Sequence, residues 1–120
     1  MKNRNGSCVP MLAACLAPLL AACAPADAHL ERGQRLLATY QCGTCHRIPG
    51  VSGARGTVGP SLDGFGRRSY IAGQIPNLPA NLVRWIHDPQ ALLPGTLMPN
   101  MGVSEADARD MAAYLGSLAP

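Results

Sequence analysis

The chain has 120 residues, of which 48% are hydrophobic but only 4% aromatic, and it contains 13 Gly and 11 Pro. That length allows one small domain, and so few aromatic side chains make a thin core, so we expect a buried cofactor to complete it. Of the ten basic residues, Lys2 and Arg4 lie near the N-terminus, and the other eight are Arg, against seven acids. The chain therefore has no basic stripe, which excludes a nucleic-acid-binding protein.

The N-terminal residues are typical of an export signal. Lys2 and Arg4 precede an apolar run over residues 9–22 that prolines interrupt. The run is too short and too broken to be a good membrane-spanning helix, whereas this pattern of charge and apolar residues is that of a signal peptide. We therefore expect the chain to be exported to the periplasmic side of a membrane.

Two kinds of processing site compete after this run. Leu-Ala-Ala-Cys, ending at Cys23, resembles the lipobox of bacterial lipoproteins, in which the Cys becomes the lipid-modified first residue; a similar sequence ends at Cys15 but leaves a very short apolar region. Cleavage after Ala28 would instead release a soluble protein. We expect a membrane anchor at Cys23. The expected organisation is a signal peptide over 1–22, a tether over 23–29 and one domain over 30–120.

The first element expected in the domain is an amphipathic helix over residues 30–40. Leu36, Leu37 and Tyr40 fall near helical spacing. Gly33 lies on or near the same face, although Gly weakens a helix by about 1 kcal/mol relative to Ala. A close crossing with another helix at Gly33 would explain its presence.

The helix leads into Cys42-Gly43-Thr44-Cys45-His46, whose C-x-x-C-H spacing is that of covalent haem attachment. Two thiols three positions apart can each add to one haem vinyl group, and the adjacent His46 then lies beneath the iron as proximal ligand. Three alternatives fit less well. A thioredoxin-like dithiol needs a βαβ context and no His, a zinc site needs further ligands, and a disulfide across two residues would be strained.

Further along the chain, residues 48–66 are rich in Gly, Pro and Ser without a sustained period and predict a loop. A helix is expected to start at Pro79 and to stop before Pro89. The last helix opens at the N-cap Ser104. With no convincing strands, the fold class is all-α, with three to five short helices and ordered loops around the cofactor. The expected buried stripe of the last helix is Ala108, Met111, Ala112, Leu115 and Leu118.

An iron atom held by His46 has a sixth position to fill. The C-terminal half offers Met98, Met101, Met111 and His87. Met98 is favoured, because its Pro-Gly-Thr-Leu-Met-Pro loop has two prolines that stiffen the backbone and hold a thioether at a fixed distance. Met101 is the competitor, whereas Met111 falls on the buried stripe and His87 lies at a helix end, where a solvated or capping residue is usual.

These motifs together resemble a class I cytochrome c, over residues 30–118. The resemblance rests on the first helix with Gly33, the C-G-T-C-H motif, a Gly-Pro-Ser-Leu segment at 59–62, Trp85, the P-G-T-L-M-P loop and Tyr114. Residues 59–99 are similar, more closely, to the cytochrome c domain fused to subunit II of some bacterial haem-copper oxidases. The copper-binding and membrane portions of that subunit are not in this sequence, so oxidase membership does not follow.

The resemblance implies one covalent haem c. Cys42 and Cys45 would form its thioether links, with His46 and Met98 as axial ligands. The carbonyl of Pro60 would accept a hydrogen bond from the free ring nitrogen of His46, which fixes the ring and raises its basicity.

The resemblance also implies surroundings for the haem propionates. Trp85 and Arg68 would contact them, with Tyr70 and Asn77 as further candidates. Gly33 would let the first helix cross the last close to Tyr114. Simple core packing is the alternative role for Trp85 and Tyr114.

Filled axial positions leave no open site on the iron, so the expected function is outer-sphere one-electron transfer between redox proteins, with neither a small-molecule substrate nor activity as an enzyme on its own. A Met ligand stabilises ferrous iron. Two alternatives remain. If Met98 does not bind, a five-coordinate haem could sense a gas or reduce peroxide, and the chain could also be a haem module of a larger oxidase or dehydrogenase complex.

Overall fold

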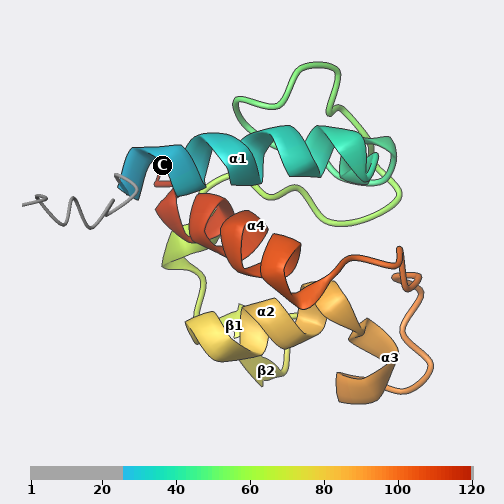
Figure 1. Ribbon diagram of the computed structural model, residues 1–120. Helices are drawn as coiled ribbons and strands as arrows, with labels where there is room; N and C mark the ends of the chain where they lie inside the picture. Colours follow the sequence, from blue (N-terminus) through green and yellow to red (C-terminus); the bar gives the residue numbers. More distant parts are fainter. Residues whose placement is uncertain (1–25, 120) are drawn as a thin grey trace, which may run out of the picture.

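The computed structural model describes residues 26–119, and helices form most of its regular structure (Figure 1). The all-α prediction is confirmed, with one addition, a two-stranded antiparallel ribbon. No helix within the described residues is long and apolar enough to cross a membrane. In chain order the elements are α1 (Ala26–Thr39), the 3-10 helices η1 (Cys42–Thr44) and η2 (Phe65–Arg67), β1 (Tyr70–Ile71), β2 (Ile75–Pro76), α2 (Pro79–His87), α3 (Pro89–Leu92) and α4 (Glu105–Ser117).

Helices α1 and α4 cross closely at Gly33, as the sequence predicts. A Cβ atom at this position would lie 2.6 Å from the backbone carbonyl carbon of Asp110 and 3.0 Å from Cβ of Tyr114. Atoms cannot approach so closely without displacing a backbone, so the crossing needs a residue without a side chain. Beside the crossing, the hydroxyl of Tyr114 donates to the carbonyl of Pro49 at 2.7 Å. This hydrogen bond ties the loop that contains Pro49 to α4.

Helix α1 begins at Ala26, within the expected tether over residues 23–29. The apolar stripe that predicted the helix starts only at Leu30, but polar contacts hold the earlier turn. Asp27 lies in the first turn, where a negative charge is favourable, and Nδ1 of His29 lies 2.8 Å from Oδ1 of Asp110 on α4. Residues 23–25, with Cys23 and the expected signal peptide, lie outside the described residues.

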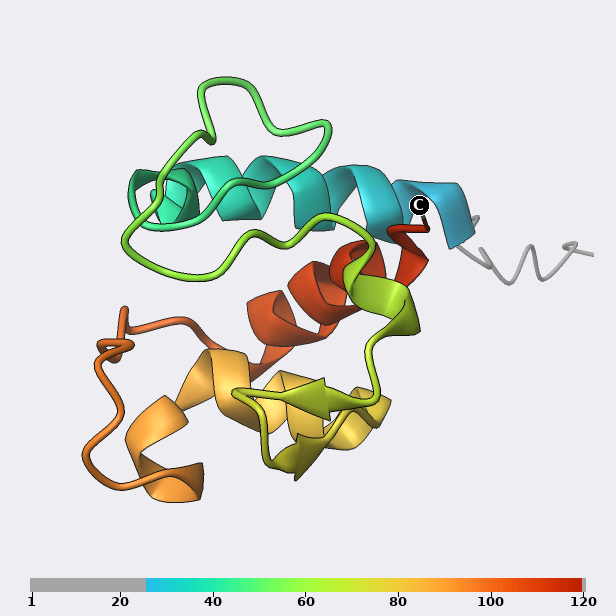
Figure 2. The same ribbon diagram turned by 180° about the vertical axis from the view of Figure 1, so that it is seen from behind.

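The core lies where α4 packs between α1 and α2, an arrangement that both ribbon views show (Figures 1 and 2). Leu37 of α1, Trp85 of α2 and Met111 of α4 are buried there. Helix α4 begins as predicted, with the hydroxyl of Ser104 accepting from the N–H of Asp107 at 3.1 Å. The same helix therefore joins the two halves of the domain that carry the predicted iron ligands.

The chain after α2 holds one helix that the sequence did not predict. Pro89 ends α2 as expected, but it also occupies the first turn of the four-residue helix α3. The side chain of Asp88 caps α3 by accepting from the N–H of Ala91 at 3.3 Å. A single turn is too short to show a hydrophobic period, so only the Asp-Pro pair could have indicated it.

Candidate functional site

The C-x-x-C-H motif lies on a tight turn directly after α1. Gln41 has a left-handed backbone with φ of 56°, which turns the chain into η1. The N–H groups of Cys45 and His46 both donate to the carbonyl of Cys42, at 3.2 and 3.0 Å. Both cysteines are half-buried free thiols, and burial raises the pKa of Cys42. The turn thus presents two unpaired thiols one helical turn apart.

Glycine residues let the following loop lie against this motif, backbone to backbone. The N–H of Gly56 donates to the carbonyl of Gly43 at 3.0 Å, and that of Gly59 donates to the carbonyl of Cys45 at 2.7 Å. A Cβ atom at Gly43 would lie 2.6 Å from Cα of Ala54. Residues 48–66 form mostly irregular structure, as predicted, and their first part is held to the motif by these bonds.

The His46 ring is fixed by the segment Gly59-Pro60. Its Nδ1 donates to the carbonyl of Pro60 at 2.8 Å, which is the hydrogen bond that the family resemblance implies. A Cβ atom at Gly59 would lie 2.7 Å from Nδ1, so the ring occupies the space that a side chain there would need. Since Nδ1 carries the proton, Nε2 has the lone pair that can bind a metal.

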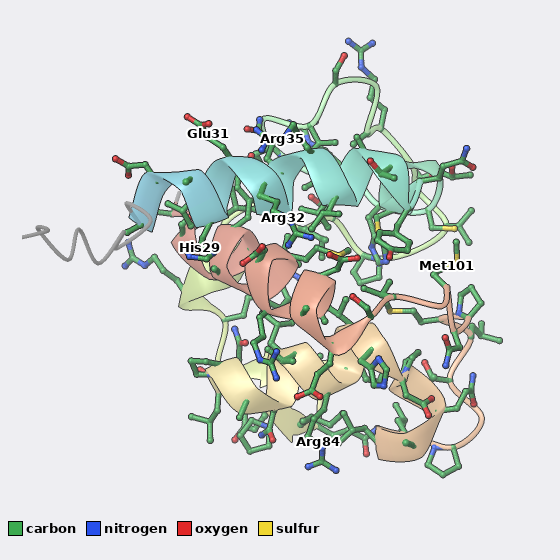
Figure 3. All side chains as sticks on the ribbon, in the orientation of Figure 1. His29, Glu31, Arg32, Arg35, Arg84 and Met101 are labelled. Atoms are coloured by element: carbon green, nitrogen blue, oxygen red, sulfur yellow. The ribbon has the colours of Figure 1, made fainter. Side chains whose placement is uncertain are left out.

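Met98 differs from Met101 in its environment. Met98 is half-buried and packs against the hydrophobic core, whereas Met101 is 45% exposed and lies at the tip of the loop, on the side of the loop that follows α1 (Figure 3). Met111 is buried in α4, as predicted. His87 donates from Nδ1 to the carbonyl of Val103 at 2.7 Å, a contact that ties α2 to the segment before α4. Met111 and His87 are thus engaged elsewhere, and Met98 remains the predicted ligand.

Sequence reasoning missed Gln90, a side chain that braces the Met98 loop. From α3, its Nε2 donates to the carbonyl of Thr96 at 2.7 Å and more weakly to that of Met98 at 3.4 Å. Its Oε1 accepts from the N–H of Gly95 at 3.1 Å. The single side-chain amide of Gln90 thus makes hydrogen bonds to both sides of the turn that carries the Met98 thioether. A lone Gln before an apolar run gives no sequence signal for this role.

Arg68 and Asn77, two of the predicted propionate contacts, lie together. The guanidinium of Arg68 donates to the carbonyls of Ser61 and Asp63, the latter at 3.2 Å. The side-chain amide of Asn77 donates to the carbonyl of Arg68 at 3.0 Å and to that of Phe65 at 3.2 Å. Both side chains therefore already hold the 61–68 segment in place.

The other two predicted propionate contacts lie in different environments. Trp85 is buried in the core, and its indole N–H makes no hydrogen bond to any described residue. Tyr70 lies on β1 and is largely exposed. The indole N–H of Trp85 is thus free to donate a hydrogen bond, whereas the Tyr70 side chain points away from the core.

One hollow in the described residues does not coincide with the predicted iron site. Its volume is about 990 Å³, and residues 47–61 line it, without Cys42, Cys45, His46 or Met98. It is an open depression in the long loop. The predicted site therefore stays with the sulfur and imidazole groups of Cys42, Cys45, His46 and Met98.

The residues present fit a covalently bound haem c. The motif offers two free thiols, His46 keeps one ring nitrogen for iron, and a braced loop holds a half-buried thioether in Met98. Imidazole and thioether are a known pair of axial ligands to haem iron in cytochromes. No disulfide or side-chain hydrogen bond within the described residues competes for these groups.

Comparison with known proteins agrees with this geometry. The family model described as Cytochrome c matches residues 30–119. The cytochrome c oxidase subunit 2 of Alkalihalophilus pseudofirmus is 37% identical over 95 residues, which is 78% of this chain and 27% of that protein. The chain therefore matches only about a quarter of this relative's length.

Proposed function

Because this chain belongs to the cytochrome c family, we propose that it is a monohaem carrier that passes single electrons between protein partners on the periplasmic side of a membrane. Its cofactor, haem c, supplies a one-electron ferric/ferrous couple. The observation that carries the proposal is the pairing of an oriented imidazole, His46 on Pro60, with a braced thioether, Met98 on the Gln90 loop. Two such ligands would hold the iron and leave no position on it for a substrate.

Each residue of the proposed site has a separate task. The thiols of Cys42 and Cys45 would each add across a vinyl group and form a thioether bond. Nε2 of His46 and the sulfur of Met98 would bind the iron, and the Pro60 carbonyl would raise the basicity of the imidazole. The free indole N–H of Trp85, with Arg68, supports the proposal that they meet the propionates, with Tyr70 and Asn77 as outer contacts.

The experiment that tests this function compares two methionine variants. Met98→Ala is expected to remove the weak red-end absorption band of Met-ligated ferric haem and to open the iron to carbon monoxide. Met101→Ala should keep the band, because that side chain lies outside the core. Met98→His should retain six ligands but lower the reduction potential, since imidazole favours ferric iron more than a thioether does. Ready binding of carbon monoxide by the unmutated protein would instead favour the five-coordinate sensor or peroxidase-like alternative.

A second candidate function is that of a haem module in a larger complex. The identity to an oxidase subunit 2 is the observation that favours it. Purification of the chain from its native membranes in mild detergent distinguishes the two. A free carrier should separate without companions, whereas a module should copurify with other subunits in constant ratio.

We also propose that the chain is held at the membrane through a lipidated Cys23, a residue outside the described part of the structure. The proposal rests on the Leu-Ala-Ala-Cys sequence. Several acyl chains would suffice, because each buried CH₂ contributes roughly 0.8 kcal/mol. Cys23→Ser should abolish lipid labelling and membrane fractionation. An intact mass that shows an unmodified N-terminus at His29 would establish the soluble form.

A further inference from the structure

The segments that carry the proposed iron ligands or contact the His46 ring contain no Asp, Glu, Lys or Arg. They are residues 41–46, 56–60 and 89–103. The ribbon views place the loop before α4 and one turn of the loop between η1 and η2 at the same end of the molecule, where α1 ends (Figures 1 and 2). Arg47, at the border, is paired with Asp63 at 2.9 Å. Apart from this pair and the exposed Arg55, which directly precedes residue 56, the surface around the proposed iron site is therefore uncharged.

Large apolar side chains are exposed on this same surface. Leu97 is 99% exposed and directly precedes Met98, and Val58 is 85% exposed and directly precedes Gly59, which contacts the His46 ring. Met101, labelled in Figure 3, is the third. Large apolar side chains this exposed are unfavourable in water unless something covers them. We call the surface formed by Val58, Leu97 and Met101 the neutral face.

We propose that the neutral face is the docking site for a redox protein that presents an uncharged, apolar patch of its own. The inference rests on the proposed electron-transfer function and adds the chemistry of the partner. A strongly charged partner would find no opposite charge on the neutral face, and its own charges would lose water without compensation. Two neutral patches instead gain from apolar burial alone, which is non-directional and is not screened by salt.

Electron self-exchange tests the docking chemistry without a known partner, because a second copy of the chain presents such a patch. In a half-reduced sample, a ferrous copy gives one electron to a ferric copy, and NMR line widths report the rate. We expect the rate of the unmutated protein to change less than about twofold from 10 mM to 1 M salt, over which the Debye length falls from about 30 Å to about 3 Å.

Three variants make the test specific. Leu97→Lys and Val58→Lys should each slow exchange about tenfold at low salt, because like charges then face each other, and 1 M salt should restore part of the rate. Leu97→Gln should slow exchange without making it depend on salt. Leu78→Lys is the matched control, since Leu78 is also an exposed leucine but lies at the start of α2, away from the neutral face.

Other outcomes would overturn the inference. Unchanged exchange in Leu97→Lys and Val58→Lys would show that docking occurs elsewhere, and a steep salt dependence in the unmutated protein would show that charge governs it. A stable dimer in sedimentation that Leu97→Lys dissolves would make a second copy the occupant. Voltammetry distinguishes a failure of the docking proposal from a failure of the proposed function. A protein that shows no reversible one-electron reduction would contradict the electron-transfer function itself.

Discussion

Gln90 is the residue on which the position of the Met98 loop depends most directly. Its single amide group makes hydrogen bonds to Gly95, Thr96 and Met98, so it connects α3 to both sides of the turn. The two prolines of the loop limit its backbone freedom but do not attach it to the rest of the domain. The bonds from Gln90 supply that attachment.

Gln90→Ala should therefore weaken the proposed Met98–iron bond more than it weakens the fold. Each lost hydrogen bond at this exposed site contributes about 0.5–1.5 kcal/mol or less. The red-end absorption band should disappear at a lower temperature than in the unmutated protein, ahead of the loss of helical circular dichroism. Asn100→Ala is a suitable control, because the Asn100 side chain bonds only Gly102 in the same loop, at 2.8 Å. Simultaneous loss of band and helix in Gln90→Ala would contradict a positioning role.

The sequence predicted the site residues that are neighbours in the chain, but it did not predict contacts that form only where a loop folds back. The two thiols and His46 are fixed by neighbours in sequence, and the resemblance also supplied the Pro60 carbonyl. Gln90 acts on residues beyond a turn whose path only the fold determines. The exposure of Tyr70 has the same origin, because the small ribbon that directs it outward was not predicted.

At the scale of elements, an ion-pair network joins α1 to α4 beside the Gly33 crossing. Asp110 is a buried carboxylate that accepts from Arg32 and from Nδ1 of His29, the latter at 2.8 Å (Figure 3). Asp107 accepts from Arg32 and from the hydroxyl of Tyr40 at 2.8 Å. These polar contacts explain why α1 starts before its apolar stripe, which periodicity alone could not predict.

The network should make stability depend on pH in the acid range. Burial raises the pKa of Asp110, but Arg32 and His29 outweigh burial, so the net pKa is lowered; the Tyr40 hydrogen bond lowers that of Asp107. A lowered pKa in the folded state stabilises the fold above the ordinary carboxyl pKa of about 3.9, and this contribution is lost as the pH falls through the lowered value.

Asp110→Asn should thus unfold more easily than the unmutated protein at neutral pH, and the difference should shrink as the pH falls below about 4. Denaturant unfolding at a series of pH values measures it. Glu31→Gln is the matched control, because Glu31 forms only an exposed pair with Arg35 at 3.8 Å, and such a pair contributes about 0.5 kcal/mol or less. A difference for Asp110→Asn that stays constant down to pH 2 would rule out this linkage.

Across the whole molecule, the proposed iron ligands come from the two halves of the chain. His46 follows α1, and Met98 follows α2 and α3, while α4 packs against both α1 and α2. The apolar stripe of α4 was predicted because it is periodic and well capped. The relation between the halves was not predicted, since it depends on the close approach at Gly33 and on contacts between residues far apart in sequence.

The aromatic content of the core suggests what the cofactor contributes to folding. Phe65 and Trp85 are its only buried aromatic residues among those described, and the segment between η1 and η2 has no regular element of its own. Two backbone bonds hold that segment to the Cys42–His46 turn. A covalent haem at this turn would pack against the turn and against the segment between η1 and η2. Its binding energy would then add to the free energy of folding.

Replacing both Cys42 and Cys45 by Ser should therefore give little stable protein, with less helical circular dichroism and a broad thermal transition. The unmutated protein, once denatured, should keep its haem through the thioether bonds. Met98→Ala is the control, because it removes an axial ligand but neither thioether, and it should retain the covalent haem and most of the helix. A haem-free double variant that is fully helical and unfolds in one sharp transition would show that the protein core suffices. In that event the Gly33 crossing, the polar network of α1 and α4 and the buried stripe of α4 would stabilise the fold on their own, and the haem would serve electron transfer alone.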